Sequence, residues 1–319
     1  MLEHKMSLTS LRVSAPRAVV LAALTLASCA NSPAIAPGQG VNVGEASQLR
    51  KIVPAEELEQ SSATQYASLV QQASAKGQVA AANDPQLARL QAISTRIIPN
   101  ASRFNPRAGS WGWQVTLIRS SEINAFCMPG GKIAFYTGLI ETLKLTDNEI
   151  AIVMGHEMAH ALREHGRAQI AKQGLTNIGQ QAITAIAGQT AGSVAQSGAG
   201  LLTLKFSRDD ETDADLVGLE LAARAGYDPH AGVTLWKKMA AASKGAPMEW
   251  FSTHPSGETR ISTIEKNIPA VLPLYQQAKN TTKGSRAKPS VLLRILAKSK
   301  NCSAGPKRNK SELLSYRLR

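Results

Sequence analysis

The chain has 319 residues, of which 43% are hydrophobic and 18% charged, and its formal net charge is +13. This length suffices for one sizeable hydrophobic core. Most of the excess charge lies in residues 279–319, where twelve Lys and Arg accompany a single acidic residue, Glu312. The three cysteines imply no disulfide framework, and no internal repeat or phosphate-binding loop is evident. No nucleic-acid-binding module is evident either, so we expect no specific nucleic-acid partner.

Residues 1–28 have the features of an export signal. Basic residues precede an apolar run at residues 18–28, which is too short to span a bilayer comfortably. Leu26-Ala-Ser-Cys29 resembles a bacterial lipobox, which predicts cleavage before Cys29 and lipid attachment to its sulfur. The alternative is an ordinary signal peptide cut near Ala30. Ala30, rather than Asp, follows Cys29, and by resemblance to Gram-negative lipoproteins this implies a lipid anchor at the periplasmic face of the outer membrane. The alternative cleavage implies a soluble periplasmic protein.

The segment before the chemical motifs predicts a tether, two helices and a small sheet. Residues 29–54 are rich in Asn, Ser, Pro, Gly and Gln, which is typical of a linker. Helices are expected over residues 55–74 and from Asp84-Pro85 onward. Three β-prone segments follow, at residues 113–118, 123–128 and 132–136, with a Pro-Gly-Gly turn before the last. Cys127 lies in the second of these segments and is interpreted as a packed thiol.

The stretch His156-Glu157-Met158-Ala159-His160 matches H-E-x-x-H. Thr146 and Glu149 form a capping-box pattern ahead of it, and we expect the helix to end at Gly166. On that helix the two histidines share one face and can take two positions of a tetrahedral zinc site. Glu157 can then act as a base on water rather than bind the metal. The alternative is a buried amphipathic helix whose histidines are hydrogen-bonded core residues.

Two histidines do not complete a zinc site, so a further protein ligand is needed. The acidic cluster that follows Ser207 predicts a helix start, with Glu211 and Asp215 on one face. One carboxylate can bind metal while the other accepts a hydrogen bond from a ligating imidazole. The alternative is a solvated acidic helix N-terminus that the helix dipole stabilises. The spacing alone leaves these two interpretations open.

Together these motifs resemble the gluzincin metallopeptidases of the HtpX and CAAX-prenyl-protease family. The resemblance covers residues 55–278 and includes four motifs: Gly155–His160, Ser207-Arg208-x-x-Glu211-x-x-Ala214-Asp215, Ser252-Thr253-His254-Pro255 followed by Arg260, and Asn124-Ala125-Phe126 with Pro129-Gly130-Gly131. It implies an α+β fold, a mostly helical zincin-like domain with a small β-sheet beside the H-E-x-x-H helix. Together with the lipobox, it implies a lipoprotein-type member.

The resemblance also implies roles for single residues. His156, His160 and Glu211 would hold one Zn²⁺ per chain, and Glu157 would be the catalytic base. Three further roles follow from it: Asp215 as the partner of a ligating histidine, Arg260 as a structural anchor, and Asn124 and Ala125 as the substrate-binding edge strand. His254 would lie near the open metal position, where it either stabilises the oxyanion or occupies the metal and holds the enzyme off. His165 is expected to face away from the histidine pair and to be structural.

The implied function is that of a zinc-dependent endopeptidase in cell-envelope protein quality control, with unfolded envelope proteins as substrates. The alternative is a latent metallopeptidase that acts mainly as a chaperone-like or scaffolding protein. The basic tail, residues 279–319, is predicted to be disordered or weakly helical. It is interpreted as a solvated extension, with binding to anionic lipid or nucleic acid as the alternative.

Overall fold

The computed structural model describes residues 40–181, 198–243, 249–255 and 259–287. By its internal contacts the chain divides after Ala34, and every described residue belongs to the second unit. The predicted signal segment, Cys29 and most of the basic tail lie outside the described residues. Their assignments, including the lipid attachment at Cys29, therefore stay predictions.

The described chain begins with helices. α1 (Ala55–Ala75) and α2 (Pro85–Ile97) form where the sequence predicts helices. Asp84 caps α2 by accepting hydrogen bonds from two backbone N–H groups, and Pro85 suits the first helical position because its ring fixes a helical φ. Three short 3-10 helices flank this pair: η1 (Gln48–Ile52), η2 (Ile98–Arg103) and η3 (Pro106–Ser110).

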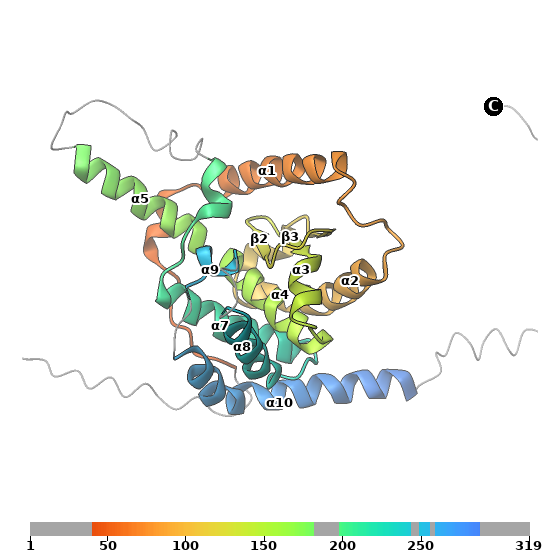
Figure 1. Cartoon of the computed structure of the whole chain (residues 1–319). Coiled ribbons are helices and arrows are strands. Elements are labelled where there is room, and N and C mark those ends of the chain that lie inside the picture. The colour runs from red at the N-terminus through yellow and green to blue at the C-terminus, as the bar shows by residue number, and fades with distance from the viewer. Residues whose placement is uncertain (1–39, 182–197, 244–248, 256–258, 288–319) are drawn as a thin grey trace, which may run out of the picture. The chain divides into compact units, whose positions relative to one another are not determined.

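A three-stranded sheet follows, as predicted. Its strands are β1 (Gln114–Ile118), β2 (Ala125–Met128) and β3 (Lys132–Tyr136), in the order β1-β3-β2. β3 runs parallel to β1 and antiparallel to β2, so β2 forms one edge. Because α1 packs against β2 and β3 while α4 packs against β2, the sheet lies between these two helices (Figure 1).

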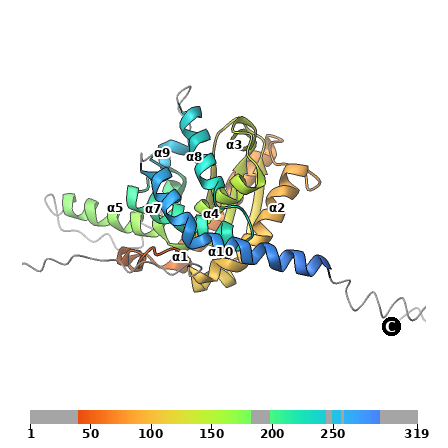
Figure 2. The same ribbon diagram turned by 90° about the horizontal axis from the view of Figure 1, so that it is seen from below.

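The remainder of the chain is helical. Its elements are α3 (Thr137–Thr142), α4 (Asp147–Leu162), α5 (His165–Gln181), η4 (Gly198–Thr203), α7 (Arg208–Arg224), α8 (Ala231–Ala242), α9 (Trp250–Thr253) and α10 (Arg260–Ala287). α7 packs on α4, and α10 runs along α7 and α8 (Figure 2). α10 continues past residue 278, where the sequence analysis placed the end of the domain. The predicted α+β class, mostly helical with a small sheet beside α4, is confirmed.

None of the helices in the described part of the chain combines enough length with enough apolar character to cross a bilayer.

α4 is the central helix, and local signals set its start. The capping box is present: Thr146 accepts from the N–H of Glu149, whose carboxylate accepts from the N–H of Thr146. Burial alone would raise the pKa of the Glu149 carboxyl, but hydrogen bonds from Lys238 and Thr146 hold it below its ordinary value. The predicted end of the helix is wrong. α4 stops at Leu162, and Gly166 is the second residue of α5.

Two glycines allow α4 and α7 to cross in close contact. A Cβ atom added to Gly155 would lie 2.6 Å from the carbonyl oxygen of Gly218, and one added to Gly218 would lie 2.6 Å from the amide nitrogen of His156. Real side chains do not tolerate such distances, so glycine is required on both helices. This crossing brings the acidic start of α7 next to the histidines of α4.

Candidate metal centre

Three polar side chains project from one turn of the otherwise apolar helix α4. His156, Glu157 and His160 are each no more than 4% exposed. Buried polar groups of this kind require partners, because an unsatisfied one is costly in a protein interior. Their partners come from α7, from the segment after α9 and from α10.

α7 supplies two buried carboxylates. Its capping box, Ser207 with Asp210, fixes the start of the helix. Glu211 and Asp215 then lie one helical turn apart, 1% and 6% exposed, and both point toward α4. The structure therefore excludes the alternative of a solvated acidic N-terminus for these two residues.

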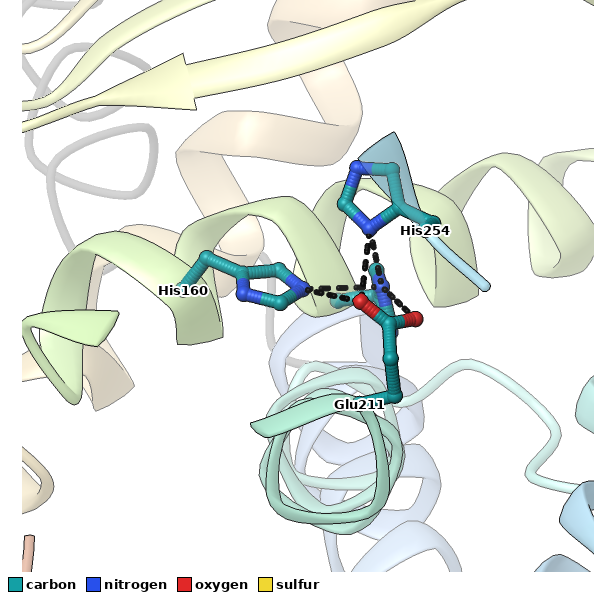
Figure 3. A group of neighbouring side chains, drawn as sticks. His160, Glu211 and His254 are labelled. Carbon is teal, nitrogen blue, oxygen red and sulfur yellow. Dashed lines mark hydrogen bonds and ion pairs between the residues drawn. The ribbon is translucent and has the colours of Figure 1, made fainter. Parts of the chain in front are cut away.

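The side chains of His160, Glu211 and His254 point toward one another from three different elements (Figure 3). The Nε2 atom of His160 lies 3.4 Å from Oε1 of Glu211 and 3.1 Å from Nε2 of His156. Nδ1 of His254 lies 2.9 Å from the same Glu211 oxygen. One ligand atom from each of these four residues lies within 4.8 Å of all the others.

This arrangement fits a bound cation. Ring nitrogens of neighbouring histidines face one another: Nε2 of His156 is also 3.4 Å from Nδ1 of His254. Lone pairs on facing nitrogens repel each other, and a cation that accepts them removes this repulsion. Burial lowers the pKa of both His156 and His160, which favours the neutral form that metal ligation requires. Two histidines with a carboxylate form a donor set typical of catalytic zinc.

Asp215 and Arg260 form the support of the site. Arg260 donates from Nε and Nη2 to the two carboxylate oxygens of Asp215, each at 2.7 Å, and from Nη1 to Oε2 of Glu211 at 2.6 Å. Asp215 Oδ1 lies 3.0 Å from Nδ1 of His156. Burial alone would raise the pKa of Asp215, but the Arg260 charge and the hydrogen bonds with His156 and Arg260 together hold that pKa low. The charged carboxylate thus orients His156 with Nε2 toward the cluster.

Glu211 is held in its charged form in the same way. Burial would raise the pKa of this carboxyl, but hydrogen bonds with His160 and His254 hold it well below its usual range. A carboxylate ligand must be ionised to bind a cation. The charge state of Glu211 therefore agrees with a metal-binding role.

Glu157 lies beside the cluster. Its Oε1 atom is buried without a hydrogen-bond partner and lies 3.6 Å from Nε2 of His254. Burial raises the pKa of this carboxyl to about 8. A group with a pKa near neutrality can both take up and release a proton under working conditions.

A cleft opens in front of these residues. Its lining combines α1, the edge strand β2, α4 and the segment after η4, and includes Leu58, Ala125, Glu157, His160 and Phe206.

Asn124 and Ala125 lie where β2 enters this cleft. The N–H of Ala125 donates to Oδ1 of its neighbour Asn124 at 2.9 Å. The backbone N–H of Ala125 is thus satisfied within the chain itself.

The sequence analysis was wrong about His165. Instead of facing away, its Nδ1 lies 3.1 Å from Nδ1 of His160. Another missed residue is Phe206, whose ring stacks on His160 with centroids 3.8 Å apart. Residue spacing gave no indication of Phe206. The contact of His165 with His160 depends on the chain reversal at residues 163–165, which the sequence analysis did not predict because it expected one continuous helix.

Comparison with known proteins decides the family. The profile of peptidase family M48 matches residues 85–268, more than half of the chain. The chain belongs to peptidase family M48. The M48 profile covers the sheet, the whole of α4 and α7, and both His254 and Arg260, so the family match and the cluster coincide.

Relatives of this M48 chain include mitochondrial metalloendopeptidase OMA1 of Arabidopsis thaliana, 38% identical over 152 residues, which are 48% of this chain and 31% of the relative. OMA1 of Schizosaccharomyces pombe is 38% identical over 160 residues, 49% of this chain and 47% of the relative. The β-barrel assembly-enhancing protease of Escherichia coli is 27% identical over 218 residues, which are 64% of this chain and 43% of the relative. The M48 chain thus spans less than half the length of each of these three relatives.

The comparisons confirm the coarser part of the resemblance. M48 peptidases are zinc-dependent gluzincin metallopeptidases, and the cluster of four residues can hold the metal. The relatives carry the names OMA1 and β-barrel assembly-enhancing protease, rather than HtpX or CAAX-prenyl protease. Both names describe proteases, in agreement with the predicted enzyme class.

The predicted location is corrected by the same comparisons. Relatives at 38% identity are mitochondrial proteins, so the assignment to the periplasmic side of a Gram-negative outer membrane is wrong. Its alternative, a soluble periplasmic protein, rested on the same residues 1–28 and is withdrawn with it. Arg and Ser residues near an N-terminus are also typical of mitochondrial transit peptides, so their presence does not identify the compartment.

Proposed function

We propose that this chain is a zinc-dependent endopeptidase that cuts unfolded or unassembled proteins. The observation that carries the proposal is the convergence of His156, His160 and Glu211 beside a carboxylate, Glu157, whose Oε1 atom has no hydrogen-bond partner. A carboxylate with one oxygen free of hydrogen bonds next to a metal-binding cluster is the arrangement that hydrolysis of a peptide bond requires.

In this proposal His156, His160 and Glu211 hold the metal. When bound, zinc supplies Lewis acidity, which makes water more acidic and polarises a peptide carbonyl. Glu157 accepts the proton of the attacking water at its free carboxylate oxygen and then delivers it to the leaving amine. Asp215, fixed by Arg260, keeps the proton of His156 on Nδ1 and so keeps Nε2 available.

The proposed mode of substrate binding follows from the fold. β2 is an edge strand beside α4, and an edge strand can pair with an extended peptide through its main chain with little regard to sequence. Only an unfolded segment can adopt that conformation inside the cleft. The bacterial relative is named for enhancing β-barrel assembly, and unassembled membrane proteins are the substrate class that this name suggests.

A second candidate, a latent peptidase with a chaperone-like role, is favoured by one observation. His254 contacts Glu211 within the cluster itself and is among the four residues that can bind the metal. With His254 as a fourth ligand, the position that a substrate carbonyl needs would be taken. Clients would then bind along β2 without being cut.

We expect the full chain with one equivalent of zinc to cleave a reduced, alkylated protein and to leave the same protein intact in its native fold. Removing the metal with a chelator should abolish cleavage, and added zinc should restore it. Gel electrophoresis and mass spectrometry of the fragments would measure both results.

His254→Ala separates the two candidates. If the wild type is inactive and His254→Ala cleaves, the latent form is correct. If both bind zinc and neither cuts the unfolded protein, the endopeptidase proposal is contradicted.

A further inference from the structure

The chain reverses sharply at the end of the metal-binding helix. α4 ends at Leu162, Glu164 adopts a φ of +59°, and α5 begins at His165. A left-handed conformation is unfavourable for a residue with a side chain. Ion pairs from Arg50 and Arg167 hold the Glu164 carboxylate on both sides, at 3.0 and 2.6 Å.

This reversal places His165 against His160. In an unbroken helix, residues five apart point in different directions, because only the spacings of three and four share a face. Here the two Nδ1 atoms lie 3.1 Å apart, and the rings meet edge to face with centroids 5.0 Å apart. His165 is only 4% exposed, so this contact is shielded from water.

A carboxylate lies on the far side of His165. Its Nε2 atom is 2.9 Å from Oδ2 of Asp213, and that oxygen also accepts from Nε of Arg163 at 2.6 Å. Arg163 in turn donates to the backbone carbonyl oxygens of Val43 and Gly44. The carboxylate is therefore fixed from two directions.

Hydrogen-bond chemistry determines where the protons lie. Nε2 of His160 faces the cluster, so it must be bare to bind a cation, and the ring proton is then on Nδ1. That N–H can donate only if Nδ1 of His165 is bare. The His165 proton must then be on Nε2, where Asp213 accepts it. With this one assignment each of the two facing N–H groups has an acceptor, Nδ1 of His165 for His160 and Oδ2 of Asp213 for His165.

We propose that His165 is a positioning residue for the metal, accepting a hydrogen bond from His160 and passing its own to Asp213, so that His160 presents Nε2 to the ion. The inference rests on the proposed ligand set. It gives the two ligating histidines different supports: His156 contacts a carboxylate directly, whereas His160 reaches one through a second imidazole. Phe206 stacks on the His160 ring and restricts its remaining motion.

The test is the zinc affinity of the full chain, measured by competition with a chromogenic chelator. His165→Phe keeps a ring of similar size but cannot accept a hydrogen bond, and we expect about 10–100-fold weaker zinc binding. His165→Asn places an oxygen where Nδ1 was, and should recover most of that loss. His230→Ala is the matched control, because His230 pairs with Asp228 on the exposed surface, and it should bind zinc as the wild type does.

Cobalt substitution provides a readout that a purely structural role would not change. The visible ligand-field spectrum of the cobalt protein should shift in His165→Phe and return toward the wild type in His165→Asn. Wild-type affinity and an unaltered cobalt spectrum in His165→Phe would overturn the inference. A wild-type chain that binds no zinc would instead overturn the proposed function.

If His165→Phe does not fold, Asp213→Asn tests the same connection from its other end. An uncharged amide is a weaker acceptor for the Nε2–H of His165. A several-fold loss of zinc affinity, with the far-UV spectrum of the metal-free protein unchanged, supports the inference. Unchanged affinity overturns it.

Discussion

Replacing Glu157 by Gln is expected to leave zinc bound and to slow cleavage of an unfolded protein by about 10²–10⁴-fold. Glutamine has nearly the same shape, so the cluster of His156, His160 and Glu211 is preserved. Its amide cannot take a proton from water, so the step that needs a base is lost. Metal content by mass spectrometry and initial rates of cleavage, measured on the same preparation, would check both halves of this expectation.

Glu141→Gln is the control for that substitution, because Glu141 is an exposed acid on α3 that lies away from the cluster. It should cleave at the wild-type rate. A Glu157→Gln protein that cleaves as fast as the wild type would rule out Glu157 as the base, even if zinc were bound.

Replacing Arg260 by Gln is expected to have the largest effect on stability. Arg260 is 5% exposed, bridges Asp215 and Glu211, and packs over the ring of Trp236 with its central carbon 3.5 Å from the ring centroid. Removing one partner of a buried ion pair leaves an uncompensated charge, which costs about 3–5 kcal/mol. We expect a loss of that size in the free energy of unfolding, measured by denaturant titration of the metal-free chain.

Two further variants serve as comparisons for the stability loss expected of Arg260→Gln. Arg260→Lys keeps the charge but loses the paired hydrogen bonds to Asp215, so it should lie between Gln and the wild type. Arg119→Gln removes a surface pair with Asp84 whose arginine is 58% exposed, and should lower the free energy of unfolding far less than Arg260→Gln does. If Arg260→Gln and Arg119→Gln lowered the free energy of unfolding equally, the buried network would contribute no more to stability than an exposed ion pair does.

Local sequence signals predicted much of this structure. The capping-box pattern at Thr146 and the acidic cluster after Ser207 predicted helix starts, and α4 and α7 begin there, each with a capping box. The spacing of four residues placed His156 and His160 on one face. The three β-prone segments between residues 113 and 136, with the Pro-Gly-Gly turn before the last, indicated the sheet. These features depend on residues close in sequence, which is why they can be recognised without coordinates.

What the sequence did not predict depends on tertiary contacts. The end of α4 is set by Glu164, a residue with no sequence preference for a left-handed conformation, held there by ion pairs with Arg50 and Arg167. The interpretation of Gly166 as a helix end hid the contact of His165 with His160. The spacing of Glu211 and Asp215 left their roles open, because only the tertiary structure shows that Glu211 lies in the four-residue cluster and that Asp215 contacts Nδ1 of His156.

The measurement that tests the central claim most directly is the number of zinc ions per chain, in the wild type and in Glu211→Ala. The geometry of His156, His160 and Glu211 predicts one zinc in the wild type and little or none in the variant at the same free zinc concentration. A wild-type chain that holds no zinc, or a Glu211→Ala chain that holds it equally tightly, would contradict the proposed metal centre.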